Sequence, residues 1–129
     1  MRLSVCILTH QRPKLFERCL QSVKLVVPEA EVIVNNDSDD IEPDQRALYL
    51  YNKGSLNSLY QSIFDTSSGS HIWFIEDDDV VLAKPTMHPG CMTLHRYITS
   101  DNKICMADID HSDFQLSQAV IPRDKSFTC

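Results

Sequence analysis

Four acidic side chains follow one another in the stretch FIEDDDVVL, residues 74–82, between two runs of apolar residues. Like charges this close repel one another, and an acidic run is most often a solvent-exposed face. A divalent cation changes that balance, because Mg²⁺ and Mn²⁺ bind carboxylate oxygens. If the segment is extended, Glu76 and Asp78 face one side and the two other acids face the opposite side. The run therefore indicates either a surface turn or a metal site.

The length and composition indicate one globular domain, residues 1–129. Hydrophobic residues make up 43% and charged residues 23% of the chain, an ordinary balance for a globular protein. No apolar run approaches the roughly 18 residues that a membrane span requires. The first residues lack the long apolar core and cleavage site of a secretory signal. We therefore expect a protein without a membrane span that resides in the cytoplasm.

The formal net charge of -6 disfavours non-specific binding to nucleic acid or anionic lipid, because both need a positive field on the protein. The five cysteines are an odd number without a CxxC pair, which argues against a disulfide framework and against a zinc ribbon. A zinc site on one side of an expected helix is a weak alternative, with His88, Cys91 and His95 as its ligands. Cys91 also falls on the apolar face of that helix, where a thiol usually packs as a small hydrophobe.

Strands and helices are expected to alternate along the chain. The predicted strands are Leu3–Leu8, Glu31–Val34, Ala47–Tyr51, residues 71–75, Lys103–Ala107 and Gln118–Ile121. One helix begins at Pro13 and continues to Val23, a second covers residues 56–64, and a third covers residues 91–98. This order predicts an α/β fold, an open, mostly parallel sheet with helices on both faces and right-handed connections.

Polar segments follow four of the predicted strands. They are Thr9 with His10, Asn35–Asp40, Asn52–Asn57 and Glu76–Asp79. Ligands of open α/β sheets bind outside the carboxyl ends of the strands. The polar segments are therefore expected to gather at one edge of the sheet and to form the binding site.

Three stretches of the chain together resemble the nucleotide-sugar-binding half of glycosyltransferase family two, which has the GT-A fold. They are SVCILTHQRPKLFERCLQSV, VIVNNDSDD and NKGSLNSLYQSIFDTSSGSHIWFIEDDDVVL. In that family the first strand ends in a Pro-Thr-Tyr-Asn-like turn and the second in an Asp-Asp-Gly-Ser-like turn. An Asn-x-Gly segment then precedes the Asp-x-Asp metal motif. The resemblance covers residues 3–85, and it implies a nucleotide-sugar-binding part at 1–85 and a short acceptor-side part at 86–129.

The resemblance also implies roles for individual residues. The nucleotide-binding residues would be Thr9, Asn36, Asp37, Ser38, Asn52, Gly54, Asn57 and Asp77. Asp78 would be the direct ligand of Mn²⁺ or Mg²⁺, with Glu76 assisting. The chain departs from the family at Asn35 and Asn36, which stand where the family often has two Asp, and at Leu56, where it frequently has Arg. An amide in place of a carboxylate still offers a donor and an acceptor to a pyrimidine base.

The resemblance therefore implies a metal-dependent glycosyltransferase that moves a sugar from a nucleotide-diphosphate sugar, with a UDP-sugar expected, to an unknown acceptor. Inverting members of the family use a carboxylate base. The candidates here are Asp108, Asp110 and Asp113, and His111 beside them is a weak metal candidate. Because the chain ends about 50 residues after the acidic run, we expect a partner or a second copy to complete the acceptor site.

Two other classes of function stay open. One is a binding module that holds a nucleotide or a nucleotide sugar without turnover. The other is an enzyme of phosphoryl transfer or hydrolysis that uses carboxylates and a metal on the same kind of sheet. The absence of a Lys-Ser/Thr phosphate loop and of an Asp nucleophile after the first strand argues against this second class.

Overall fold

The computed structural model describes residues 2–38, 40–88, 93–94, 96–98, 104–106 and 119–122. Within these residues the elements, in chain order, are β1 (Leu3–Thr9), α1 (Pro13–Val26), β2 (Glu31–Asn36), β3 (Leu48–Leu50), α2 (Leu56–Thr66), β4 (His71–Glu76), β5 (Thr93–Leu94), β6 (Arg96–Ile98), β7 (Ile104–Met106) and β8 (Ala119–Pro122). Neither of the two helices described is long and apolar enough to cross a membrane.

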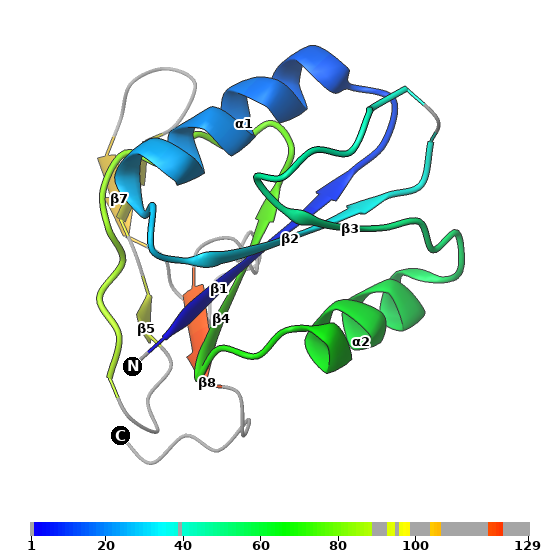
Figure 1. Ribbon diagram of the computed structural model, residues 1–129. Helices are drawn as coiled ribbons and strands as arrows, with labels where there is room; N and C mark the ends of the chain where they lie inside the picture. The colour runs from blue at the N-terminus through cyan, green and yellow to red at the C-terminus, as the bar shows by residue number, and fades with distance from the viewer. Residues whose placement is uncertain are drawn as a thin grey trace.

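The main sheet has the strand order β3-β2-β1-β4-β8-β5 in the described part of the chain. β1 lies between β2 and β4 and pairs in parallel with both, and β2 pairs in parallel with β3. β8 runs antiparallel to β4, and β5 runs antiparallel to β8. The predicted open, mostly parallel sheet is therefore confirmed (Figure 1).

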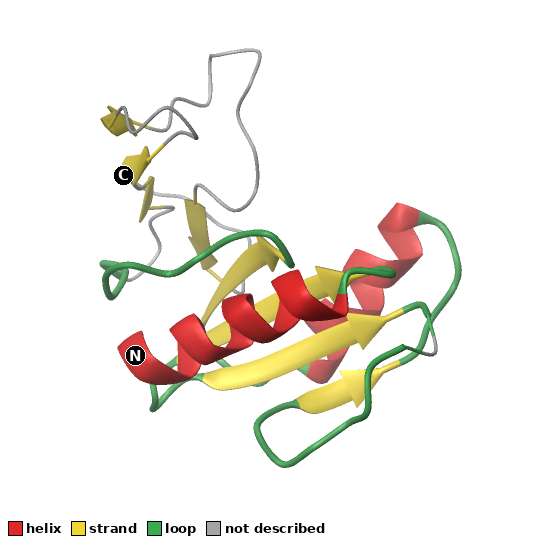
Figure 2. Ribbon diagram, turned by 90° about the horizontal axis from the view of Figure 1, so that it is seen from above, coloured by secondary structure: helices red, strands yellow, loops and turns green. Residues whose placement is uncertain are grey.

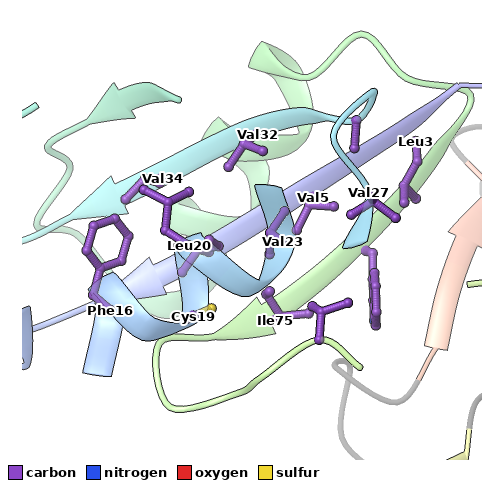
Figure 3. Packing of buried hydrophobic residues seen from close by; sticks show 14 of the residues in the cluster. Leu3, Val5, Phe16, Cys19, Leu20, Val23, Val27, Val32, Val34 and Ile75 are labelled. Atoms are coloured by element: carbon purple, nitrogen blue, oxygen red, sulfur yellow. The ribbon is translucent and has the colours of Figure 1, made fainter. Parts of the chain in front are cut away.

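One helix covers each face of the sheet, as Figures 1 and 2 show. The larger core cluster lies under α1, where Phe16, Cys19, Leu20 and Val23 pack on the alternate β1 residues Val5 and Ile7 (Figure 3). On the opposite face, Cys6 joins Ile33, Ile63 of α2 and Ile72 in a second cluster. Because alternate residues of β1 are buried on both faces, the strand reads as a nearly continuous apolar run, as is usual in parallel sheets.

The loop from β2 to β3 is tied to α1 by one arginine. Arg46 donates from both terminal nitrogens to the two carboxylate oxygens of Glu17, at 2.8 Å each, and also donates to Asp44. These bonds lower the pKa of the Glu17 carboxyl, because the nearby guanidinium favours the ionised form. The network fixes the loop beside α1.

The predicted helix over residues 91–98 is wrong, since the structure has strands there, β5 at Thr93–Leu94 and β6 at Arg96–Ile98. β5 pairs with β8 and β6 pairs with β7, so these residues gain partners in sheets. Thr, Tyr and Ile in this stretch favour extended backbone, and pairing of this kind overrides a helical spacing of apolar residues. The last two predicted strands are present as β7 and β8, but β7 belongs to a separate sheet with β6.

Candidate functional site

Three polar side chains continue the rows of core residues that face α1. Val5 and Ile7 lead along β1 to Thr9, Val32 and Val34 lead along β2 to Asn36, and Trp73 and Ile75 of β4 precede Asp77. Thr9 pairs with Asn36 in the register of β1 and β2, and Leu8 pairs with Glu76 in that of β1 and β4. The α1 face of the sheet therefore changes from apolar to polar at its carboxyl edge.

Asp77 is the centre of a buried network at this edge. Its side chain is fully buried, and Oδ2 accepts hydrogen bonds from Thr9 Oγ1 at 3.0 Å, from Arg12 Nε at 3.2 Å and from the His10 backbone N–H at 3.4 Å. Oδ1 meets Arg12 Nη2 as an ion pair only, since no hydrogen bond of normal geometry reaches it from the described residues. The network joins the end of β1, the start of α1 and the turn after β4.

The acidic run folds into a turn instead of extending the strand. β4 ends at Glu76, whose carbonyl accepts from the Asp79 backbone N–H at 3.0 Å, while Asp79 Oδ2 accepts from the Glu76 N–H at 2.8 Å. The expectation of two pairs of acids on opposite sides of an extended segment is therefore wrong. The turn gives hydrogen-bond partners to the backbone N–H and carbonyl of Glu76. If the four acids continued the strand, these backbone groups would be left to bond with solvent.

The acids of this turn differ in their surroundings. Burial raises the pKa of the Asp79 carboxyl, and burial, with Asp78 and Asp79 nearby, raises that of Glu76. Asp78 is half exposed, and its Oδ2 lies 3.7 Å from Arg12 Nη1. Its backbone carbonyl accepts from Arg18 Nη2 at 3.3 Å. Negative charge is therefore concentrated at this end of β4 and only partly offset.

The oxygen donors of the turn are of the kind that binds a divalent cation. The available ligands are carboxylate oxygens, which Mg²⁺ and Mn²⁺ prefer. Among the described residues no three potential ligands converge into a closed metal cage. A nucleotide-bound cation needs only one or two protein carboxylates, since phosphate oxygens and water complete its shell. Glu76 and Asp78, both exposed to solvent, are the residues that would serve.

The end of β2 forms a second group of polar contacts. Asn36 Oδ1 accepts from the Ser38 backbone N–H at 3.1 Å and from Ser38 Oγ at 3.0 Å, whereas its buried Nδ2 has no hydrogen-bond partner within the part of the chain that the structure describes. The Ser38 hydroxyl also accepts from the Gln11 N–H at 3.2 Å. His10 Nδ1 lies in direct contact with Asp37 Oδ1. The turn after β2 is thus joined to the turn after β1.

The segment from Asn52 to Asn57 approaches from the α2 side. Asn35, whose side chain follows the row of Ile33, clamps the backbone of Asn52 with two hydrogen bonds of 3.1 and 3.2 Å. Asn52 Nδ2 donates to Ser62 Oγ at 2.6 Å. Gly54, just before α2, and Asn57, in its first turn, are exposed, and Ser55 Oγ at the N-cap accepts from the Ser58 N–H.

The structure thus brings most of the predicted site residues to one edge of the sheet. Thr9 contacts Asp77 directly, and Asn36, Asp37 and Ser38 lie together in the next turn. Asn52 is linked to the edge only through Asn35. The predicted catalytic acids Asp108, Asp110 and Asp113 lie outside the described residues, as do Cys91 and His95.

Arg12 is a member of the site that the sequence pattern did not single out. It directly precedes Pro13, the first residue of α1, where the positive end of the helix dipole disfavours a cation. Arginine at this position is therefore expected to have an acidic partner. The acidic run at residues 76–79 was the signal in the sequence that could have pointed to one. The partner, Asp77, is 65 residues away, so local spacing does not reveal it.

No protein-family model matches the chain, and no curated protein matches it in sequence. Among solved structures, S. aureus TarS 1–349 matches with a TM-score of 0.52 and 19% sequence identity. TarS is a GT-A-type glycosyltransferase. The fold of the chain is GT-A-like. The fold that the motifs predicted is therefore confirmed.

The match covers 62% of this chain and 28% of the TarS 1–349 chain. A structure of S. aureus TarS has a TM-score of 0.47 with 18% identity, and covers 60% of this chain and 17% of that one. TarS 1–349 in complex with UDP-GlcNAc also has a TM-score of 0.47, with 20% identity over 60% of this chain and 27% of that one. The chain thus spans less than a third of these GT-A-like structures.

Proposed function

We propose that the chain binds a nucleotide-diphosphate sugar at the carboxyl edge of β1, β2 and β4 and transfers the sugar to an acceptor. The position of the Thr9–Asp77–Arg12 network carries this proposal. The chain runs outward from β1 to β2 and β3, then returns to β4 on the other side of β1, so the strand order reverses between β1 and β4. Open α/β sheets bind ligands at such a switch point, and the network bridges this one.

The donor we propose is a UDP-sugar, with its base and ribose near the turns after β1 and β2. Thr9, Asn36, Asp37 and Ser38 belong to these turns, and the Asn52–Asn57 segment borders them. Asn36 Nδ2 supports a polar ligand here, because no described residue accepts from it and a buried donor without an acceptor costs about 1–3 kcal/mol. A carbonyl of a pyrimidine base is an acceptor of the required kind.

Glu76 and Asp78 would hold the Mn²⁺ or Mg²⁺ ion that we propose as the cofactor. When bound, such an ion offsets the negative charge that develops on the diphosphate leaving group. Other residues of the edge hold the acidic turn in place. Asp77 is held inside the fold by Thr9 and Arg12, so the turn that carries Asp78 is anchored to the sheet. The acceptor hydroxyl would lose its proton to one of the acids Asp108, Asp110 and Asp113.

A second candidate function is a module that binds the nucleotide sugar without transferring it. The observation that favours it is the short shared region, which makes up only 28% of the TarS 1–349 chain. A GT-A-like region that holds a nucleotide can lack a complete acceptor site unless a partner or a second copy supplies it.

Thermal unfolding in a panel of nucleotides and nucleotide sugars, with Mn²⁺ and with chelator, tests the proposal. A ligand at about 100 times its dissociation constant adds roughly 2.7 kcal/mol to stability, which raises the melting temperature measurably. We expect UDP and UDP-sugars with Mn²⁺ to give the largest rise. Equal rises with ribose phosphate would show that the base is not recognised, and no rise with any nucleotide would refute the proposal.

Acceptor trials with the nucleotide sugar that binds best then separate the two candidate functions. Transfer of the sugar to any acceptor supports the transferase, and binding without release of nucleoside diphosphate in any trial supports the binding module. Release of phosphate from simple phosphoesters would instead favour a hydrolytic enzyme.

A further inference from the structure

We infer that Arg12 binds the diphosphate of the nucleotide ligand and that Asp77 is the residue that positions it. The inference rests on the proposed function and names a contact within that site. Its basis is a guanidinium fixed on one side by a buried carboxylate and open to solvent on the other.

The buried side of Arg12 is fully engaged. Nε donates to Asp77 Oδ2 at 3.2 Å, and Nη2 forms an ion pair with Asp77 Oδ1. Asp77 is itself held by the Thr9 hydroxyl and the His10 backbone N–H. Because Nε and Nη2 both contact the Asp77 carboxylate, the planar guanidinium cannot rotate freely. The direction in which Nη1 points is therefore fixed.

The opposite edge of Arg12 is available to a ligand. The side chain is 47% exposed, and Nη1 lies 3.7 Å from Asp78 Oδ2, too far for a hydrogen bond. The N–H groups of Nη1 are therefore not consumed by Asp78. Because Asp77 is buried and Asp78 is half exposed, only the second contact has to yield when an anion approaches.

The start of α1 supplies a second feature that favours an anion at the same place. Arg12 is the N-cap residue, and its own side chain makes no hydrogen bond that caps the first turn. That turn contains no acidic residue. The backbone N–H groups and the positive dipole end at the start of this 14-residue helix attract phosphate. The fixed guanidinium and the helix start thus offer donors to one ligand.

A purely structural role for Arg12 is the alternative. In that case Arg12 would only neutralise the buried Asp77 carboxylate. Its replacement would lower stability without changing the ratio of the affinities for UDP and for uridine. The two roles therefore differ in a ratio of affinities and not in stability alone.

The test compares UDP, measured by calorimetry with Mn²⁺, with uridine, measured by NMR chemical-shift titration. The variants are Arg12→Gln, Arg12→Lys and Asp77→Asn, and Lys14→Gln is the control that removes an exposed charge from the same turn. Because Arg12→Gln leaves Asp77 buried without its partner and can prevent folding, the double variant Arg12→Gln/Asp77→Asn, which removes both charges, is measured as well.

Loss of a charge-assisted contact predicts that Arg12→Gln and the double variant bind UDP about ten-fold or more weakly, with uridine affinity unchanged. The UDP affinities of Arg12→Lys and Asp77→Asn should lie between those of these variants and the wild type. Lysine keeps the charge but lacks the planar guanidinium, and Asp77→Asn removes the carboxylate that holds the guanidinium in place. Lys14→Gln should stay within about two-fold for both ligands. Unchanged UDP affinity in the folded double variant, or equal weakening of UDP and uridine, would overturn the inference. A wild type that binds neither ligand would refute the proposed function itself.

Discussion

Single carboxylates decide the chemistry of this edge, and each has a different environment. Asp77 is fully buried, and a guanidinium and two further donors offset the free-energy cost of burying its carboxyl group. Glu76 and Asp78 lie next to it in the chain but face solvent. Acidic residues that are neighbours in one run therefore differ in burial, one being held inside the fold and the other two being exposed to solvent.

Glu76→Gln is predicted to stabilise the protein without ligand near neutral pH. The pKa of the Glu76 carboxyl is raised above its ordinary value of 4.5, first by burial and then by Asp78 and Asp79. The folded state thus binds this proton more tightly than the unfolded state, so ionisation costs stability as pH rises from the ordinary value through the raised one. Below the ordinary value the variant and the wild type should be equally stable.

Urea unfolding at about pH 7 and about pH 4 measures this difference. Glu42→Gln, at an exposed position in the loop before β3, is the control and should show no gain at either pH. If Glu76→Gln is less stable than the wild type at neutral pH, the like charges of the turn do not oppose folding as described.

At the scale of elements, close approach of backbone segments holds β4 beside β1. Gly69, in the turn before β4, donates to Ser4 Oγ at 2.9 Å, and His71 N–H donates to the Arg2 carbonyl at 3.2 Å. A Cβ on Gly69 would lie 2.8 Å from Ser4 N and 2.9 Å from Arg2 O. The turn therefore needs glycine for lack of space, and the approach sets the start of the β1–β4 pairing that ends at the site.

Gly69→Ala is predicted to lower the free energy of unfolding by about 1–3 kcal/mol, because backbone atoms of β1 cannot move aside without loss of the strand pairing. Gly54→Ala is the matched comparison. A Cβ there meets only the side chain of Ser58, whose hydroxyl can rotate, so we expect a loss under about 1 kcal/mol. Urea denaturation of both variants checks the order, and equal losses would show that space at Gly69 is not limiting.

The elements around the site were predictable because each carries its own local signal. β1, β2 and β4 are apolar runs, and α1 and α2 have apolar residues at helical spacing after Pro13 and Ser55. The same spacing led to a wrong helix over residues 91–98, where the described strands β5 and β6 pair with β8 and β7. The contact between Arg12 and Asp77 was not predictable either, since it depends on the distance between two turns that only the folded sheet brings together.

At the scale of the whole molecule, the proposed function requires an acidic protein to bind an anionic ligand. The net charge is -6, so the overall field repels a nucleotide diphosphate. The reversal of strand order between β1 and β4 offsets this locally, because it leads the start of α1, Arg12 and the acidic turn to one point. Positive charge from Arg12 and from a bound cation would then act at short range, where the net charge of the molecule matters less.

Calorimetric titration of UDP, with Mn²⁺ and with chelator, tests most directly whether nucleotide and metal bind together at this edge. We expect chelator to weaken UDP binding by the wild type. We also expect Asp78→Asn to weaken binding in Mn²⁺ by about ten-fold or more, the scale of a lost coupling of 1–3 kcal/mol. Asp79→Asn should change it much less, because the Asn oxygen can still accept from the Glu76 N–H. Wild-type affinity that is the same with chelator and with Mn²⁺ would contradict a metal site at the acidic turn and remove the main support for metal-dependent transfer.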